Sequence, residues 1–159
     1  MTPSSTASTL RGVGGFAVAA GTLLVAAGTG AWVAVTKQLQ AEAIDVPDDA
    51  PILAGKRVQG PATACVQALV IKRHAERGAG DRTFADVSKA LRRVDGSSEE
   101  AAELRKQSVT LSTAASLRTA LMTSVLAYGV SAFAAGLGAF LLLAGSFLRR
   151  AGRVTGPIT

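Results

Sequence analysis

The chain has 159 residues, a net charge of +6 and 48% hydrophobic residues, but only 4% aromatic residues. Two runs without Asp, Glu, Lys, Arg or His, residues 12–36 and 119–148, take up about 55 residues, so a large soluble core is excluded. Acidic and basic residues are mixed between the runs, which argues against a nucleic-acid partner. The single cysteine, Cys65, excludes an intramolecular disulfide.

Residues 1–11 are rich in Ser, Thr and Pro, and this composition predicts a disordered tail. The first apolar run, residues 12–36, predicts transmembrane helix 1, because about 20 apolar helical residues cross the hydrocarbon of a bilayer. A signal peptide is the alternative. Its apolar region would span only about 7 to 15 residues, and no convincing cleavage site follows residue 36.

Residues 119–148 predict transmembrane helix 2, which residues 149–159 follow as a basic tail. Small residues recur at four-residue spacing in both runs, a pattern that lets helices approach closely. These lines are Thr22, Ala26 and Gly30; Ala17 and Gly21; and Ala127, Ser131, Ala135 and Ala139, with Ala132 and Gly136 beside them. We expect the two spans to pair with each other, and we select Ala132 and Gly136 as candidate contacts. The general abundance of small residues in membrane helices is the alternative explanation.

Residues 37–118 predict a helical region, because no stretch alternates polar and apolar residues as a strand would. Pro47 and Pro51 should end the first helix, and Pro61 should open a short helix that Gly78 and Gly80 stop. The pairing of Thr83 with Asp86 resembles a capped helix start, and Asp95-Gly96 should close that helix. Ser97 with Glu100 predicts a further capping box, from which a helix should continue into the second run.

The sequence offers few groups for catalysis. His74 is the only histidine, and Asp48 and Asp49 are adjacent residues whose side chains diverge, so we assign no catalytic, cofactor-binding or metal-binding residue and no cofactor. Cys65 is expected to be a small apolar helix residue, since its surroundings make a poor lipidation sequence. With no Asp, Glu, Lys, Arg or His in either run, a transport mechanism loses most of its support, and no small-molecule substrate is identified.

Charge in the tails indicates the orientation. Arg11, Arg149, Arg150 and Arg153 flank the two runs without any acidic residue, and short arginine-rich flanks stay in the cytoplasm. Loops longer than about 60 residues translocate largely regardless of their charge. We therefore expect a multi-pass cell-membrane protein with both termini cytoplasmic and residues 37–118 extracytoplasmic. Trp32 and Tyr128 would lie at one membrane boundary, as in an aromatic belt.

Short stretches after residue 40 resemble one protein family. They are Val46-Pro47-Asp48-Asp49-Ala50, Leu53-Ala54-Gly55, Gly60-Pro61, Gln67-Ala68, His74-Ala75, Thr83-Phe84-Ala85, Ser116-Leu117-Arg118, Thr123-Ser124-Val125 and Tyr128-Gly129-Val130. With these stretches the chain resembles small actinobacterial two-pass membrane proteins. Members often carry the label of aromatic ring-opening dioxygenases, which implies iron held by two histidines and a carboxylate. This chain has one histidine, so we treat that label as a propagated error.

The sequence thus predicts an all-α membrane protein, a two-helix transmembrane hairpin with a small helical extramembrane loop region. We expect a non-enzymatic scaffold or accessory protein of the cell envelope that contacts a membrane-protein partner, or a second copy of itself, within the lipid bilayer. Asp48, Asp49 and His74 are the candidate contacts in the loop, and Ala132 and Gly136 those in the membrane. The alternatives are a membrane-embedded metal-dependent enzyme, for which Asp48, Asp49 and His74 are the only plausible ligands, and a small holin-like pore.

Overall fold

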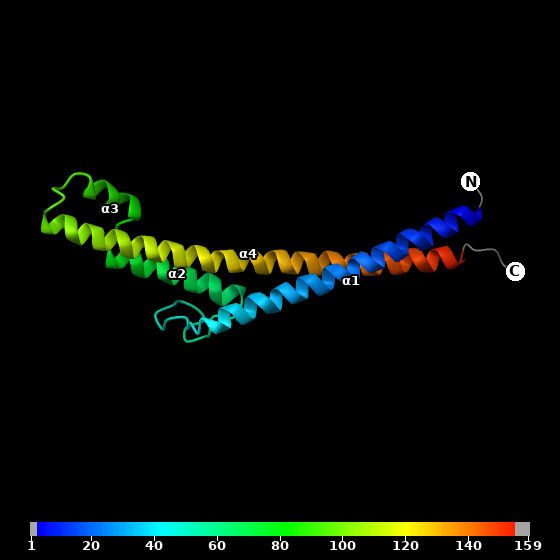
Figure 1. Ribbon diagram of the computed structural model, residues 1–159. Helices are drawn as coiled ribbons and strands as arrows, with labels where there is room; N and C mark the ends of the chain where they lie inside the picture. The colour runs from blue at the N-terminus through cyan, green and yellow to red at the C-terminus, as the bar shows by residue number, and fades with distance from the viewer. Residues whose placement is uncertain (1–2, 155–159) are drawn as a thin grey trace. The chain divides into compact units, whose positions relative to one another are not determined.

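The structure, a computed structural model, describes residues 3–154 and the side chains of residues 7–153. In this part of the chain the helices are α1 (Pro3–Ala41), α2 (Pro61–Gly78), α3 (Phe84–Leu91) and α4 (Glu99–Val154) (Figure 1). The only strand-like pairing within residues 3–154 is an isolated bridge between Asp45 and Arg57. The all-α prediction is confirmed, and α1 and α4 are each long and apolar enough to cross a membrane.

Several helix ends agree with the sequence signals, but three differ. These are the start of α1, the end of α3, which falls at Leu91 before the predicted stop at Asp95-Gly96, and the cap of α4. α1 begins at Pro3, so the prediction of a disordered tail over residues 1–11 is corrected for residues 3–11. Proline suits the first turn of a helix, and Ala7 is buried, with its carbonyl oxygen against Gly152 of α4. α2 begins at Pro61 and ends at Gly78, and α4 runs unbroken into the second apolar run, as predicted.

The described residues divide into two compact units. The hairpin unit consists of residues 3–35 and 127–154, and the loop unit of residues 36–126. In the hairpin unit α1 and α4 lie side by side and run in opposite directions (Figure 1). In the loop unit α2, α3 and the first half of α4 share a small core.

The two helices of the hairpin unit meet through glycine. A Cβ atom placed on Gly21 would lie 2.6 Å from the carbonyl oxygen of Gly138, and one on Gly138 would lie 2.7 Å from the carbonyl oxygen of Gly21. Gly14 and Gly145 approach each other in the same way, with 2.7 Å on both sides. Real Cβ atoms do not come this close to an oxygen, so only glycine allows the two backbones to touch here.

These contacts repeat every seven residues along both helices. Gly14, Gly21 and Gly28 of α1 oppose Gly145, Gly138 and Ser131 of α4, and the same register continues from Ala7 to Gly152. Seven residues are close to two helical turns, so this spacing returns to nearly the same face of a helix and gives a long seam. We call these eight residues the glycine seam.

The seam corrects the expected packing between the two spans. Gly21 and Ser131 belong to the lines chosen at four-residue spacing, and both lie in the seam. Ala132 and Gly136 are exposed, and a Cβ atom on Gly136 would have no neighbour within 4 Å. They therefore do not pack α4 against α1, because they occupy a different face of α4. Their role as contacts for a separate partner stays a prediction.

One aromatic contact lies in the hairpin unit. The rings of Trp32 and Tyr128 have centroids 4.6 Å apart and meet edge to face. Tyr128 is buried, whereas Trp32 keeps 39% of its surface exposed. The sequence placed both residues at the same level of the two spans, and the structure brings them into contact. Edge-to-face pairs add to the attraction that comes from burial alone.

The loop unit is held by a core of small and branched apolar side chains. Its buried members are Ala75, Ala79, Val87, Leu104, Leu111 and Ala114, with Ile71, Ala90, Leu91 and Val94 packed against them. Phe84, the first residue of α3, is 50% exposed. α3 starts as predicted, because the Thr83 hydroxyl accepts from the Asp86 amide and the Asp86 carboxylate accepts from the Thr83 amide. Hydrogen bonds from the Thr83 hydroxyl and amide lower the pKa of Asp86.

The cap of α4 differs from the predicted capping box. Ser98, and not Ser97, caps the helix, since its hydroxyl accepts from the amide of Ala101 at 3.1 Å. Ser97 is held instead by Asp95, whose carboxylate accepts from the Ser97 amide and hydroxyl. The pKa of Asp95 is lowered by these two bonds. The Asp95 carboxylate therefore binds the Ser97 hydroxyl that the predicted capping box would have used.

Substitution of Gly138 tests the seam. Gly138→Ala should weaken the pairing of α1 with α4 by about 1–3 kcal/mol, the usual cost of overpacking, because the new Cβ atom meets the backbone of Gly21. Gly136→Ala is the matched control, since its Cβ atom meets nothing. Trp32 is the only tryptophan, so its fluorescence during an SDS titration of the detergent-solubilised protein reports the unfolding midpoint. Equal midpoints for the two variants would show that the seam does not hold the hairpin.

Candidate functional site

The segment between α1 and α2 closes on itself through backbone hydrogen bonds. The amide of Val46 donates to the carbonyl of Lys56 at 2.9 Å, and the amide of Val58 donates to the carbonyl of Ile44 at 2.8 Å. Val46 and Val58 are 1% and 0% exposed, so both ends of the loop are anchored by buried side chains. We call residues 44–58 the clamped loop.

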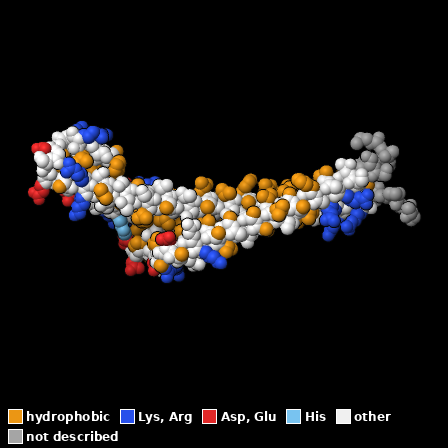
Figure 2. Space-filling model, in the orientation of Figure 1, with side chains coloured by type: hydrophobic (Ala, Val, Ile, Leu, Met, Phe, Trp, Pro, Cys, Tyr) orange, Lys and Arg blue, Asp and Glu red, His pale blue; other side chains and the backbone are white. Residues whose placement is uncertain are grey.

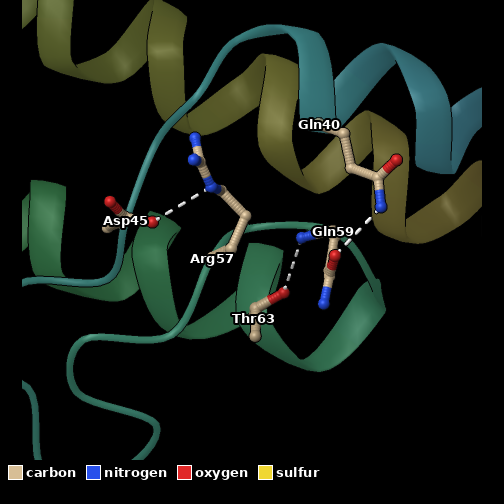
Figure 3. A network of polar contacts seen from close by, with 5 residues as sticks. All are labelled: Gln40, Asp45, Arg57, Gln59 and Thr63. Carbon is tan, nitrogen blue, oxygen red and sulfur yellow. Dashed lines mark hydrogen bonds and ion pairs between the residues drawn. The ribbon is translucent and has the colours of Figure 1, made fainter.

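Polar side chains join the base of the clamped loop to the neighbouring helices (Figure 3). Asp45 and Arg57, the two residues of the isolated bridge, also form an ion pair at 3.3 Å. The Gln40 amide group, in the last turn of α1, donates to Gln59 at 2.9 Å. The backbone amide of Gln59 in turn donates to the hydroxyl of Thr63 in α2. Apart from the half-buried Thr63, these side chains are exposed, so their contacts fix the position of the loop but add little to the free energy of unfolding.

A histidine–aspartate contact ties the clamped loop to α2. Nε2 of His74 donates to a carboxylate oxygen of Asp49 at 2.6 Å. Both side chains are nearly half exposed. The sequence indicates both residues as separate partner contacts, and the structure shows that they contact each other. Asp48 lies beside them, is exposed, and faces the turn at Gly55.

The charge state of Asp49 links this contact to pH. The hydrogen bond from His74, together with the charges of His74 and Arg73, lowers the pKa of Asp49. A carboxyl whose pKa is lower in the folded state stabilises the fold above its unfolded pKa of about 3.9. That contribution is lost as the pH falls through the lowered pKa. The contribution of the Asp49 carboxylate is therefore fully present at neutral pH.

The tip of the clamped loop carries apolar side chains. Ile52 is 61% exposed, and Leu53 has a φ of 58°, a left-handed conformation that disfavours a branched side chain. The amide of Lys56 donates to the carbonyl of Leu53, and Gly55 supplies a second positive φ. A strained backbone that the surrounding bonds hold in place is typical of binding loops. This tip was not predicted from the sequence, although an apolar pair between Pro51 and Gly55 could have indicated it.

The concave surfaces of the loop unit include a pocket of about 150 Å³ formed by α2, α3 and α4. Phe84 and Leu111 form part of its wall, and Lys72 and Arg118 are among its charged residues. Pockets that enclose small molecules usually exceed about 300 Å³. The clamped loop is therefore the better candidate for contact with a large partner.

The residues do not fit the iron centre that the family label implies. Asp49 and His74 supply one carboxylate and one imidazole, and these bind each other. Within the described part of the chain no three His, Cys, Asp or Glu side chains gather where a metal ion could sit. Iron in ring-opening oxygenases needs a second imidazole, and the sequence holds none.

The predicted contact residues thus fall in separate units. Asp48, Asp49 and His74 lie together in the loop unit, while Ala132 and Gly136 lie in the hairpin unit. Cys65 is half-buried in α2, in agreement with a small helix residue.

No family model, no curated protein and no solved structure matches this chain.

Removing the Asp49 carboxylate tests the clamp. Asp49→Asn should speed tryptic cleavage after Lys56 and Arg57 by up to about fivefold, the most that an exposed ion pair contributes, because the loop opens more often. Asp48→Asn is the matched control, which removes the same charge one residue away. The cleavage rate is measured by mass spectrometry at neutral pH on the folded, detergent-solubilised chain. If both variants are cut equally fast, the contact with His74 does not restrain the loop.

Proposed function

We propose that this chain is an integral membrane protein whose hairpin unit spans the bilayer. The supporting observation is the exterior of that unit, where large apolar side chains are exposed, as Figure 2 shows in orange. They include Val13, Phe16, Leu23, Phe133, Phe140, Leu143 and Phe147, each more than half exposed. Such a surface is unstable in water, whereas lipid chains solvate it.

We further propose a cell-membrane location with both termini in the cytoplasm and residues 37–118 outside it. Arginine without acidic residues at the termini supports this orientation, together with a loop too long to be retained by charge. The resemblance to small actinobacterial two-pass proteins supports a place in the cell envelope.

The function that fits these features is that of a non-enzymatic scaffold or accessory subunit. The clamped loop presents Ile52 and Leu53 on a backbone fixed by bonds on both sides, and Asp48, Asp49 and His74 lie beside them in the same unit. A loop fixed before binding loses little conformational entropy when it docks. We infer that this surface contacts the extramembrane part of a membrane-protein partner.

The rival functions receive less support. A metal-dependent oxygenase would need ligands that the chain does not provide. A holin-like pore would need a polar lining, but the seam joins α1 to α4 through backbone contacts, and only Ser and Thr side chains make the runs polar.

The proposed orientation is tested by thiol labelling. Cys65 is the only thiol, so a membrane-impermeant maleimide should label it in intact cells if residues 37–118 are exported. Because Cys65 is half-buried, Ala102→Cys in a Cys65→Ala background provides an exposed site in the same unit. Labelling of this Ala102→Cys variant only after lysis would place the loop unit in the cytoplasm.

The proposed contact surface is tested by photocrosslinking in cells. A benzophenone amino acid at Ile52 should give one discrete adduct, and Asp49→Asn should reduce its yield, because the open loop no longer presents the tip in one position. The same group at Val109, which is 65% exposed on α4, is the control. An adduct of twice the chain mass would identify a second copy as the partner. Equal adducts from both positions would show that the loop tip is not a specific contact.

A further inference from the structure

Four arginines gather at one end of the hairpin unit. Arg11 belongs to α1, and Arg149, Arg150 and Arg153 belong to α4. All four are exposed, and Figure 2 shows them as a blue patch at that end of the unit. Residues 1–35 and 127–159 contain no Asp or Glu, so no side-chain carboxylate of these segments balances this charge.

The glycine seam builds this cluster. A Cβ atom on Gly14 would lie 2.8 Å from Cγ of Arg149, and one on Gly152 would lie 3.0 Å from Cγ of Arg11. Each of these arginine stems therefore crosses a glycine of the opposite helix. The packing of the two helices therefore brings arginines of both to the same end of the unit. The glycine contacts fix where the side chains of Arg11 and Arg149 leave the helix surface.

Helix dipoles do not account for the arrangement. Arg153 lies in the last turn of α4, where a cation meets the negative end of the dipole. Arg11 lies toward the positive end of α1, where the dipole gives a cation no advantage. Arginine stems can lie along apolar surface while their heads reach the polar boundary, and guanidinium groups bind phosphate oxygens in pairs.

We propose that Arg11, Arg149, Arg150 and Arg153 form a binding site for the phosphate group of an anionic glycerophospholipid. The site takes a lipid of the leaflet in which this end of the hairpin lies, and it rests on the proposed insertion of the hairpin. The apolar surface of the same unit holds the acyl chains of that lipid, and the four arginines select its headgroup by charge.

The test uses the full chain reconstituted in phosphatidylcholine bilayers with trace spin-labelled phosphatidylglycerol or phosphatidylcholine. The protein should restrict the motion of phosphatidylglycerol more than that of phosphatidylcholine, with a preference of about fivefold for each arginine that contacts the phosphate. Arg11→Gln with Arg149→Gln should remove most of this preference. Arg92→Gln with Arg93→Gln, a pair in the loop unit, removes the same charge elsewhere and should leave the preference unchanged.

Three results would overturn the proposal. The first is equal restriction of the two lipids, and the second is an equal loss of lipid preference in the two double variants. The third is loss of the preference when inorganic phosphate replaces chloride at equal ionic strength, which would indicate a site for free anions. Flotation of the same vesicles after a carbonate wash measures insertion separately. A chain that does not float contradicts the membrane proposal itself, whereas a chain that floats and binds both lipids equally contradicts only the lipid site.

Discussion

The hairpin unit depends on backbone contact between α1 and α4. At Gly21 and Gly138 each helix places a carbonyl oxygen where the other would carry its Cβ atom, so neither position tolerates a side chain without movement. The repeat of this contact every seven residues fixes the register of the two helices over the whole unit. It also decides which side chains face outward, because a seam of glycines needs no large residue between the helices.

Because glycines fill the interface, the large apolar side chains of the hairpin unit lie on its outer surface. Phe16, Phe133 and Phe147 would fill the interface in a water-soluble helix pair, where burial of apolar area holds the helices together. Here they are each more than 70% exposed. In the lipid that we propose surrounds this unit there is no hydrophobic drive to bury them, and close packing of small residues would supply the attraction between the helices instead. The same sequence choice therefore explains both the close backbones and the apolar exterior.

Local signals in the sequence predicted most of the helices, but they did not predict the contacts between them. Pro61, Gly78 and the Thr83–Asp86 pair marked helix ends correctly, because the groups that cap a helix lie within a few residues of it. The four-residue rule found Gly21 and missed the seven-residue register, which follows from matching two distant segments. Ser97 failed as a cap for a local reason, since Asp95 binds it first.

The candidate site shows the same limit. Asp49 and His74 were selected from the sequence as polar groups in a region with few of them, but their contact spans 25 positions of the chain. It exists because Val46 and Val58 anchor the clamped loop and set where residue 49 lies relative to α2. The sequence shows that the two side chains are present, but only the fold of the loop brings Asp49 and His74 into contact. A carboxylate and an imidazole that satisfy each other leave no free ligand pair for a metal, and they hold Ile52 and Leu53 in a loop whose backbone is already fixed. This arrangement is the support for our proposal that the loop contacts a partner.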